Sequence, residues 1–447
     1  MPYEGEFASY RSINRIAQDD RVKQFLIRSR VMAPSITAPS LNPQEAPPAN
    51  AIPVSFAVAI DGSYADVLVK NGYPGASVGY VTVTSVLLDL LMLERLDEIR
   101  PIDPVAFRKT EQADTIDSVL PGSNVLTRDH RTACSAFREE LFDVLHSACI
   151  DSDDPTTLLD TFNHLLSLKP RTSPQKCPCT GCDEEFLVTP TSGTCACPRQ
   201  CRIYPTDSLR IHERFNEFGS NGEAFGLVMQ TWERVLLIHF LRCFERKNIL
   251  KSMGKLVLFV DGPLAMFGPP AWISAAISKE LKRLNVIVQA QTGNDLMIVG
   301  VEKTGAFVEH FEGIDQAENG KFRFEPRTYA LLTDKYIKSR IALSDSDRRY
   351  GQDTYFGRKF FYKTASGDRI VASIPFLNDA QDTLDSDDVT LYPQFGNICT
   401  ILDKLRSSRY PNSLTPIISA HGYASIPVRL GSKVLQQLAL ALMAPNP

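Results

Sequence analysis

The sequence predicts an α/β protein in which a mixed sheet of parallel and antiparallel strands is flanked by helices and carries one small cysteine-rich insert. Three observations predict this class. Apolar strand-like runs alternate with helical patterns along most of the 447 residues, a late segment has the alternation and Ser-Gly-Asp turn of a hairpin, and six of the ten cysteines fall in one short stretch. A chain of this length has room for two or three domains, or for one large domain with insertions.

The composition is that of an ordinary globular protein. Hydrophobic residues make up 43% and charged residues 22% of the chain, and the formal net charge is −4. A nearly neutral chain binds nucleic acid only through a local basic patch. No apolar run approaches the ~20 residues that cross a bilayer, and the first residues, MPYEGEFASYRS, lack the basic and apolar blocks of a signal peptide. We therefore expect a cytoplasmic protein without a membrane segment.

The N-terminal part, residues 1–53, is expected to be a helix followed by a proline-rich arm. Up to about residue 32, apolar residues are spaced for one helical face between basic side chains. Residues 33–53 are rich in proline and cannot continue a helix, which is typical of a linker or an extended arm.

The first part of the core is expected in residues 54–170. It begins with the strand-like run VSFAVAI, which ends in Asp61-Gly62, and continues through a glycine-rich turn, the strand VTVTSV and helical patterns. Residues 171–205 form the cysteine-rich insert. Residues 206–447 are expected to supply the remainder of the core and the C-terminal helices.

The remainder of the core begins with a long amphipathic helix over about residues 222–250, which leads into the strand LVLFVD. Beyond it a helix feeds VIVQAQ, which we expect to be a strand, and MIVGVEK has the pattern of another strand. Residues 354–376 have the pattern of a hairpin, and helices are expected over residues 395–405 and 430–443. Strands and helices in this order are typical of an α/β sheet.

The cysteine-rich insert has the spacing of a zinc site. The segments CPCTGC and CACPRQC offer Cys-x2-Cys and Cys-x3-Cys pairs, which suit tetrahedral zinc bound by four thiolates. Six cysteines compete for the four places: Cys177, Cys179, Cys182, Cys195, Cys197 and Cys201. The set we favour is Cys179, Cys182, Cys197 and Cys201, with Cys177 and Cys195 as alternates. A closed four-sulfur site has no open position for a substrate, so we expect a structural or docking role; the alternative is a reduced cluster without metal.

Two aspartates follow similar buried strands. Asp61-Gly62 comes after VSFAVAI, and Asp261-Gly262 comes after LVLFV. If these strands are neighbours in one sheet, their carboxylates lie close together, and cutting a phosphodiester with metal-activated water needs such converging carboxylates. The alternative is that each Asp-Gly pair is only a turn. Glu233, in the apolar helical sequence QTWERVLLIHF, is a third candidate, and a solvent-facing helix charge is its alternative.

A late histidine and a late tyrosine complete the candidate site. His421 follows PIISA, which we expect to be a strand. Near metal-bound carboxylates an imidazole can coordinate the metal or protonate a leaving group. Tyr410 can orient a phosphate or pack beside the site.

A basic strand is the candidate contact with nucleic acid. In YFGRKFFYK, aromatic residues alternate with Arg358, Lys359 and Lys363, as in a strand that meets single-stranded nucleic acid. The alternative is an edge strand kept soluble by its charges. The sequence has no Walker A loop, dinucleotide-binding glycine fingerprint, G-x-S-x-G elbow or H-E-x-x-H helix, so we expect no ATP hydrolysis by the chain itself.

In their order and spacing, several segments resemble the NurA nuclease family, the partners of HerA-type translocases. The segments are IDGSY, the helix that carries Glu233, FVDGPL, LLTDKYIKSRI, the predicted hairpin, and PIISAHGYASIP. The cysteine-rich insert resembles the zinc-ribbon insert of a bacterial branch of this family.

The resemblance implies an RNase H-like core, manganese- or magnesium-dependent cleavage of DNA, and a homodimer that receives DNA from a hexameric HerA-type ATPase. Asp61 and Asp261 would be metal-binding carboxylates, with Glu233 completing the metal site. His421 would be the late catalytic histidine, and Tyr410 a further catalytic residue. The expected role is DNA end processing or defence against foreign DNA. Two alternatives stay open: an inactive nuclease-fold adaptor for the ATPase, and a zinc-ribbon protein with a DNA-binding or regulatory role.

Overall fold

The computed structural model describes most of the chain. The described residues are 10–30, 39–50, 54–70, 75–97, 108–127, 132–150, 153–170, 174–179, 182–316, 321–407, 410, 412–427 and 430–443.

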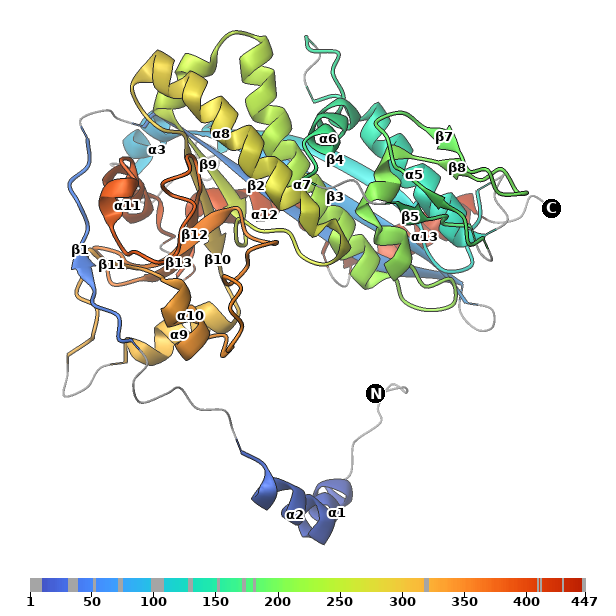
Figure 1. Ribbon diagram of the computed structural model, residues 1–447, viewed down its shortest axis with the longest axis horizontal. Helices are drawn as coiled ribbons and strands as arrows, with labels where there is room; N and C mark the ends of the chain where they lie inside the picture. Colours follow the sequence, from blue (N-terminus) through green and yellow to red (C-terminus); the bar gives the residue numbers. More distant parts are fainter. Residues whose placement is uncertain are drawn as a thin grey trace.

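Within the described residues, nine strands form one mixed sheet (Figure 1). In order across the sheet they are β1 (Gln44–Glu45), β11 (Thr328–Leu331), β12 (Gly357–Lys363), β13 (Arg369–Pro375), β10 (Met297–Glu302), β9 (Leu256–Asp261), β2 (Phe56–Lys70), β3 (Ala76–Asp89) and β4 (Glu111–Pro121). Strand β9 is parallel to both β10 and β2, and the other neighbouring pairs are antiparallel. The prediction of a mixed sheet flanked by helices is confirmed.

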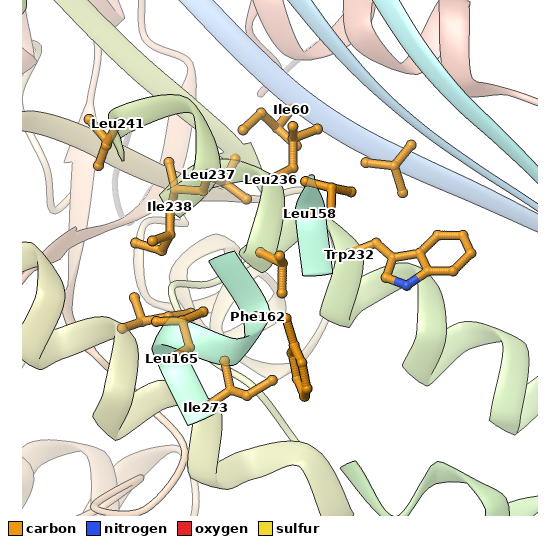
Figure 2. Packing of buried hydrophobic residues seen from close by; sticks show 14 of the residues in the cluster. Ile60, Leu158, Phe162, Leu165, Trp232, Leu236, Leu237, Ile238, Leu241 and Ile273 are labelled. Carbon is orange, nitrogen blue, oxygen red and sulfur yellow. The ribbon is translucent and has the colours of Figure 1, made fainter. Parts of the chain in front are cut away.

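One face of the sheet is covered by four helices. They are α5 (Ala133–Ser147), α6 (Leu158–Ser167), α7 (Gly222–Arg246) and α8 (Trp272–Thr292). Figure 2 shows the core beneath them, where Trp232 and Leu236 of α7 pack with Phe162 of α6, Ile60 of β2 and Ile273 of α8. The apolar face of α7 thus fixes the position of this long helix on the sheet.

The opposite face is covered by α11 (Phe395–Leu405) and α12 (Thr415–Ala424). Ile417 and Ala420 of α12 pack with Ala57 and Ala59 of β2 in a second core. A third core forms at β11–β13 under α9 (Ala306–Ile314) and α10 (Asp334–Arg340). These cores together cover the parallel centre of the sheet on both faces.

The remaining elements lie at the periphery. Helices α3 (Leu90–Asp97) and α13 (Leu430–Leu442) contact β2, and α1 (Arg11–Gln18) and α2 (Asp20–Arg28) are set apart from the sheet with their side chains exposed or partly exposed (Figure 1). The cysteine-rich segment forms two short hairpins from the strands β5 (Gln175–Lys176), β6 (Glu185–Phe186), β7 (Gly193–Thr194) and β8 (Arg202–Ile203). The glycine-rich turn expected after β2 falls partly outside the described residues.

Two expected strands are helical, and these predictions are wrong. VIVQAQ is the last part of α8, which runs unbroken from Trp272 and buries Leu281, Leu284 and Val288 at helical spacing. PIISA lies in α12, with Pro416 in its first turn. Short apolar runs do not distinguish a buried helix from a buried strand by periodicity, so the surrounding chain decides. The predicted hairpin is confirmed as β12–β13, and the predicted long helix as α7.

None of the helices in the described part of the chain is both long enough and apolar enough to cross a membrane.

Candidate active site

Asp61 and Asp261 occupy equivalent positions where strands β2 and β9 separate. The parallel pairing of the two strands ends with Ile60 opposite Val260, and each aspartate is the next residue. Strand β9 ends at Asp261, whereas β2 continues along β3 to Lys70. The prediction that the two strands are neighbours is confirmed, although Asp61 lies inside a long strand and not at its end. The two strands therefore separate at the point where the two carboxylates lie.

Alternation along β2 directs neighbouring side chains to opposite faces of the sheet. Ala59 belongs to the core under α12, and Ile60 belongs to the core under α7. By the same alternation, Asp61 faces α12 and Gly62 faces α7. The site is therefore built from both faces of the sheet.

His421 comes to Asp61 from helix α12. Its Nδ1 lies 2.9 Å from Asp61 Oδ2. The hydroxyl of Thr82 on β3 donates to the carbonyl oxygen of Ala424 at 2.6 Å, which fastens the end of α12 to the sheet. Asp61 is only 2% exposed, whereas the side chain of His421 is 56% exposed. Asp61 therefore orients an imidazole that remains open to solvent.

Glu233 comes from α7 on the other face, where Gly62 makes room for it. A Cβ at position 62 would lie 2.9 Å from Glu233 Oε1 and 2.6 Å from Met229 Cγ, so only glycine allows this approach. Glu233 is buried, and the alternative of a solvent-facing helix charge is wrong. The glycine of the first Asp-Gly pair thus has a packing role beside the carboxylates.

Burial and neighbouring carboxylates raise the pKa of Asp61 and of Glu233. Burial, and then the charge of Asp261, raises the pKa of Asp61 to about 6, against the opposing effects of Lys303 and His421. Burial raises the pKa of Glu233 to about 8, and the charges of Asp61 and Asp261 add to this effect. Carboxylates that repel one another in this way are stabilised by a bound cation.

Arg234 was not predicted from the sequence, and it fixes the loop after β9. Its Nη1 lies 3.2 Å from Glu233 Oε2, and its Nη2 donates to the carbonyl oxygens of Pro263 at 3.0 Å and Asp261 at 3.3 Å. A buried guanidinium that bridges a helix carboxylate and strand carbonyls holds the two elements together. The signal in the sequence is the arginine within the apolar helix run WERVLLI.

Lys303 is a second residue that sequence reasoning missed. It follows β10, and its Nζ lies 3.1 Å from Asp261 Oδ1. Because β10 and β9 are parallel neighbours, their carboxyl ends lie at the same edge of the sheet. The lysine directly after the strand MIVGVE was therefore the available signal. In this structure its ammonium group neutralises Asp261.

A cleft of about 820 Å³ opens over these groups. Its lining includes Asp261, Lys303, Tyr410, Asn412 and His421. Tyr410 is 45% exposed there. The structure thus brings four predicted residues, Asp61, Asp261, Glu233 and His421, to one place and puts Tyr410 on the wall of the same cleft.

The donor set fits a hard divalent cation. Carboxylate oxygens are the ligands that Mg²⁺ and Mn²⁺ prefer, and burial, followed by the charge of neighbouring carboxylates, raises the pKa of Asp61 and of Glu233. Asp61 and Asp261 are placed to hold the ion, and Glu233 to complete the site. A closed arrangement is not formed: within the described residues, groups of three or more ligands with all ligand atoms within 4.8 Å of one another consist of cysteines.

The cysteine-rich insert contains two overlapping groups of four sulfur ligands. They are Cys177, Cys182, Cys195 and Cys197, and Cys177, Cys179, Cys197 and Cys201. A disulfide joins Cys179 to Cys201. The first group has the composition of a four-thiolate metal site such as that of zinc, and the second has it only when the disulfide is reduced. Neither group is the favoured set of Cys179, Cys182, Cys197 and Cys201, because Cys177 is common to both.

The three basic residues of β12 are buried, so the prediction that they contact DNA is contradicted. Lys359 forms an ion pair with Glu302, Lys363 Nζ lies 2.9 Å from Asp315 Oδ2, and Arg358 is fully buried. The physical reason is that β12 pairs on both sides, with β11 and β13, and helices cover its faces. The edge-strand alternative is wrong for the same reason.

Comparisons with known proteins identify no family. No family model matches the sequence, and no curated protein matches it. Among solved structures, the crystal structure of the NurA nuclease from Sulfolobus solfataricus aligns with 97% of this chain and 93% of that one, at 10% identity and a TM-score of 0.33. A likeness of this size carries no functional conclusion, which depends instead on the geometry of the site.

Proposed function

We propose that this protein is a divalent-metal-dependent nuclease that hydrolyses phosphodiester bonds of DNA. The observation that carries the proposal is the meeting of Asp61 and Asp261 at the separation of two parallel strands, with Glu233 approaching from the other face. Converging buried carboxylates beside an open cleft are the arrangement that metal-assisted phosphodiester hydrolysis requires.

Each residue of the site has a separate task in this reaction. A bound Mn²⁺ or Mg²⁺ would supply an activated water and neutralise charge on the phosphate. Asp61 and Asp261 would hold the ion, and Glu233 would complete its ligands. Lys303, in the lining of the cleft, is placed to bind the phosphate when it no longer neutralises Asp261. Tyr410, on the cleft wall, would orient the same group.

His421 is placed to transfer a proton to the leaving oxygen. Its Nδ1 faces the carboxylate of Asp61 at 2.9 Å, so the other ring nitrogen is directed away from that carboxylate. A carboxylate that accepts from one ring nitrogen fixes the orientation of the ring. His421 would therefore donate from Nε2 to the oxygen released by the cut, while Asp61 retains it in position.

The finer assignment follows from the sequence resemblance. We infer an RNase H-like core of the NurA type, a homodimer, and action in the cytoplasm with a hexameric HerA-type ATPase in DNA end processing or in defence against foreign DNA. Zinc, bound by four of the six clustered cysteines, would stabilise the insert. We also propose the domain limits that the sequence predicts, with the insert at residues 171–205.

The experiment that tests the function is cleavage of labelled single- and double-stranded DNA in the presence of Mn²⁺. Wild-type protein is compared with Asp61→Asn and Asp261→Asn, alone and with a HerA-type ATPase, and Asp114→Asn, an exposed carboxylate on β4, is the matched control. We expect cleavage by the wild type and by the control, and none by the two site variants, all four remaining folded by circular dichroism. Equal cleavage by all four would show that the aspartates are turn residues. No cleavage by any, with zinc bound but no second, weaker manganese site, would favour the inactive adaptor.

A further inference from the structure

A second cleft, of about 520 Å³, lies beside the hairpin turn between β12 and β13. Among the described residues that line it are Phe322 and three cationic side chains, Lys321, Lys363 and Arg369, against one carboxylate, Glu325. Lys363 belongs to the strand predicted to contact nucleic acid, but the sequence does not predict this cleft, because its lining residues come from separate segments. The buried Asp315 pairs with Lys363 and Arg369, so three cations stand against two carboxylates and the cleft has a net charge of +1. A positively charged surface attracts a phosphate-bearing ligand.

The ring of Phe322 contacts two cationic side chains and is partly exposed to solvent. The Nζ of Lys363 lies 3.9 Å from the ring centroid, and the guanidinium of Arg369 lies 5.8 Å from it. Both cations are fixed in turn by the fully buried Asp315, at 2.9 Å and 2.8 Å. Phe322 nevertheless remains 48% exposed. A large apolar ring that is fixed by cations and open to solvent is available for a flat ligand to stack on.

The second cleft adjoins the active-site cleft. Asn412 lines the active-site cleft, and its Oδ1 accepts a hydrogen bond of 2.8 Å from the backbone N–H of Arg369, which lines the second cleft. Tyr410, two residues before Asn412, adds an exposed ring on the active-site side. Exposed aromatic rings and cationic side chains are therefore present in both of these adjoining clefts.

We propose that the second cleft binds single-stranded DNA next to the position of the cut, with a base stacked on Phe322 and the backbone near Lys321 and Arg369. The proposal rests on the nuclease function proposed above and deepens it, since it names the strand state of the substrate and where that strand is held. Aromatic rings combined with a positively charged groove are the arrangement by which single strands are bound without sequence preference. A base in a duplex is already stacked on its neighbours and cannot lie on the ring. The cationic lining favours DNA over an apolar peptide segment.

The test is the affinity of the protein for oligothymidylates of about 4 and about 16 nucleotides, lengths that span the usual site sizes for single strands. Binding is followed by fluorescence anisotropy with Ca²⁺ in place of Mn²⁺, so that the carboxylates can hold a divalent cation, and electrophoresis after each titration verifies that the oligonucleotide is intact. Wild-type protein is compared with Phe322→Ala, Phe322→Trp and Lys321→Gln. The matched control is Phe218→Ala, because Phe218 is 85% exposed and lies in neither lining.

We expect Phe322→Ala to weaken binding of the longer oligonucleotide by about 5- to 100-fold, the usual loss for one stacked base. The shorter oligonucleotide, which the active-site cleft alone can hold, is expected to bind with unchanged affinity. Phe322→Trp retains a ring and is expected to bind as the wild type does, Lys321→Gln to bind more weakly with a smaller salt dependence, and Phe218→Ala to bind normally.

Three results would overturn the proposal. Unchanged affinity of Phe322→Ala for the longer oligonucleotide would remove the stacking role and leave the nuclease function intact. Unchanged DNA affinity together with lost binding of a HerA-type ATPase would assign the cleft to a protein partner. Absence of any DNA binding by the wild type would overturn this proposal and the nuclease function together.

Discussion

Replacing Asp61 with asparagine is expected to stabilise the metal-free protein while it weakens metal binding. Burial and the charge of Asp261 raise the pKa of Asp61 from 3.8 to about 6. An acid whose pKa is higher in the folded state binds its proton more tightly there than in the unfolded chain. The free energy of unfolding therefore falls as the pH rises from about 4 to about 6 and stays lower above that range.

The magnitude follows from the difference between the two pKa values. About two pH units correspond to about 3 kcal/mol of destabilisation above pH 6. Asparagine has nearly the same shape, and its Oδ1 can still accept the hydrogen bond of 2.8 Å from the N–H of Gly62. The lost hydrogen bond to the half-exposed His421 costs about 1 kcal/mol. The variant is thus expected to be more stable by about 2 kcal/mol at pH 8, or about 2 °C in Tm for a chain of this length.

The assay is differential scanning calorimetry at pH 4 and pH 8, with and without Mn²⁺. We expect Asp61→Asn to have the higher Tm at pH 8 and to lose this advantage at pH 4, where the wild-type carboxyl is protonated in the folded state and about half protonated in the unfolded chain. Mn²⁺ at about 100 times its Kd stabilises a protein that binds it by about 2.7 kcal/mol, so it should raise the Tm of the wild type by about 3 °C and leave the variant unchanged. A variant that is less stable than the wild type at pH 8, or that responds equally to Mn²⁺, would refute the reasoning. Asp114→Asn is the control.

Three further predictions concern other charged and sulfur groups. Lys303→Ala is expected to raise the affinity for Mn²⁺ by about 5-fold, measured by isothermal titration calorimetry, because an ammonium group that contributes ~1 kcal/mol no longer competes for Asp261; an unchanged affinity would contradict this role. Lys359→Met is expected to lower the free energy of unfolding by about 3 kcal/mol in urea, since it leaves the mostly buried side chain of Glu302 without its ion partner; a change below about 1 kcal/mol would contradict the assignment. Cys177→Ser is expected to abolish zinc binding, measured by atomic absorption, because Cys177 belongs to both sulfur groups; retained zinc would exclude both.

The carboxylate pair was predictable from the sequence because its signal is local. Each aspartate directly follows an apolar run long enough for a buried strand, and neighbouring parallel strands end at the same edge of a sheet. Glu233 was predictable as a candidate because it interrupts an apolar helix. That these groups meet depends on the register of β2 on β9, which the sequence does not contain. Lys303 was missed because it reaches Asp261 through the pairing of β10 with β9, and Arg234 because it reaches Asp261 through the packing of α7 against the loop after β9.

The basic strand β12 shows why the exposure of a strand was harder to predict. Alternating aromatic and basic residues are typical of a strand with one solvated face. In the structure, Glu302 and Asp315, which lie 57 and 48 residues away in the sequence, neutralise Lys359 and Lys363 inside the protein. A charge that finds such a distant partner can be buried, and no local pattern reveals the partner. The interpretation of VIVQAQ failed for a related reason, since its helical neighbours in α8 decided its conformation.

The charges of the site account for the order in which its ligands would bind. The carboxylates of Asp61, Asp261 and Glu233, when all are ionised, exceed the cations of Arg234 and Lys303 by one charge. Burial, and then the charges of Asp61 and Asp261, raise the pKa of Glu233 to about 8 against the opposing charge of Arg234, so without a metal this carboxyl holds a proton at neutral pH. A divalent ion displaces that proton and reverses the sign of the excess. The site then carries one positive charge, which matches the single negative charge of one phosphodiester. Under the proposed function the metal therefore has to bind before DNA can enter the cleft, because the unloaded carboxylates would repel the phosphate.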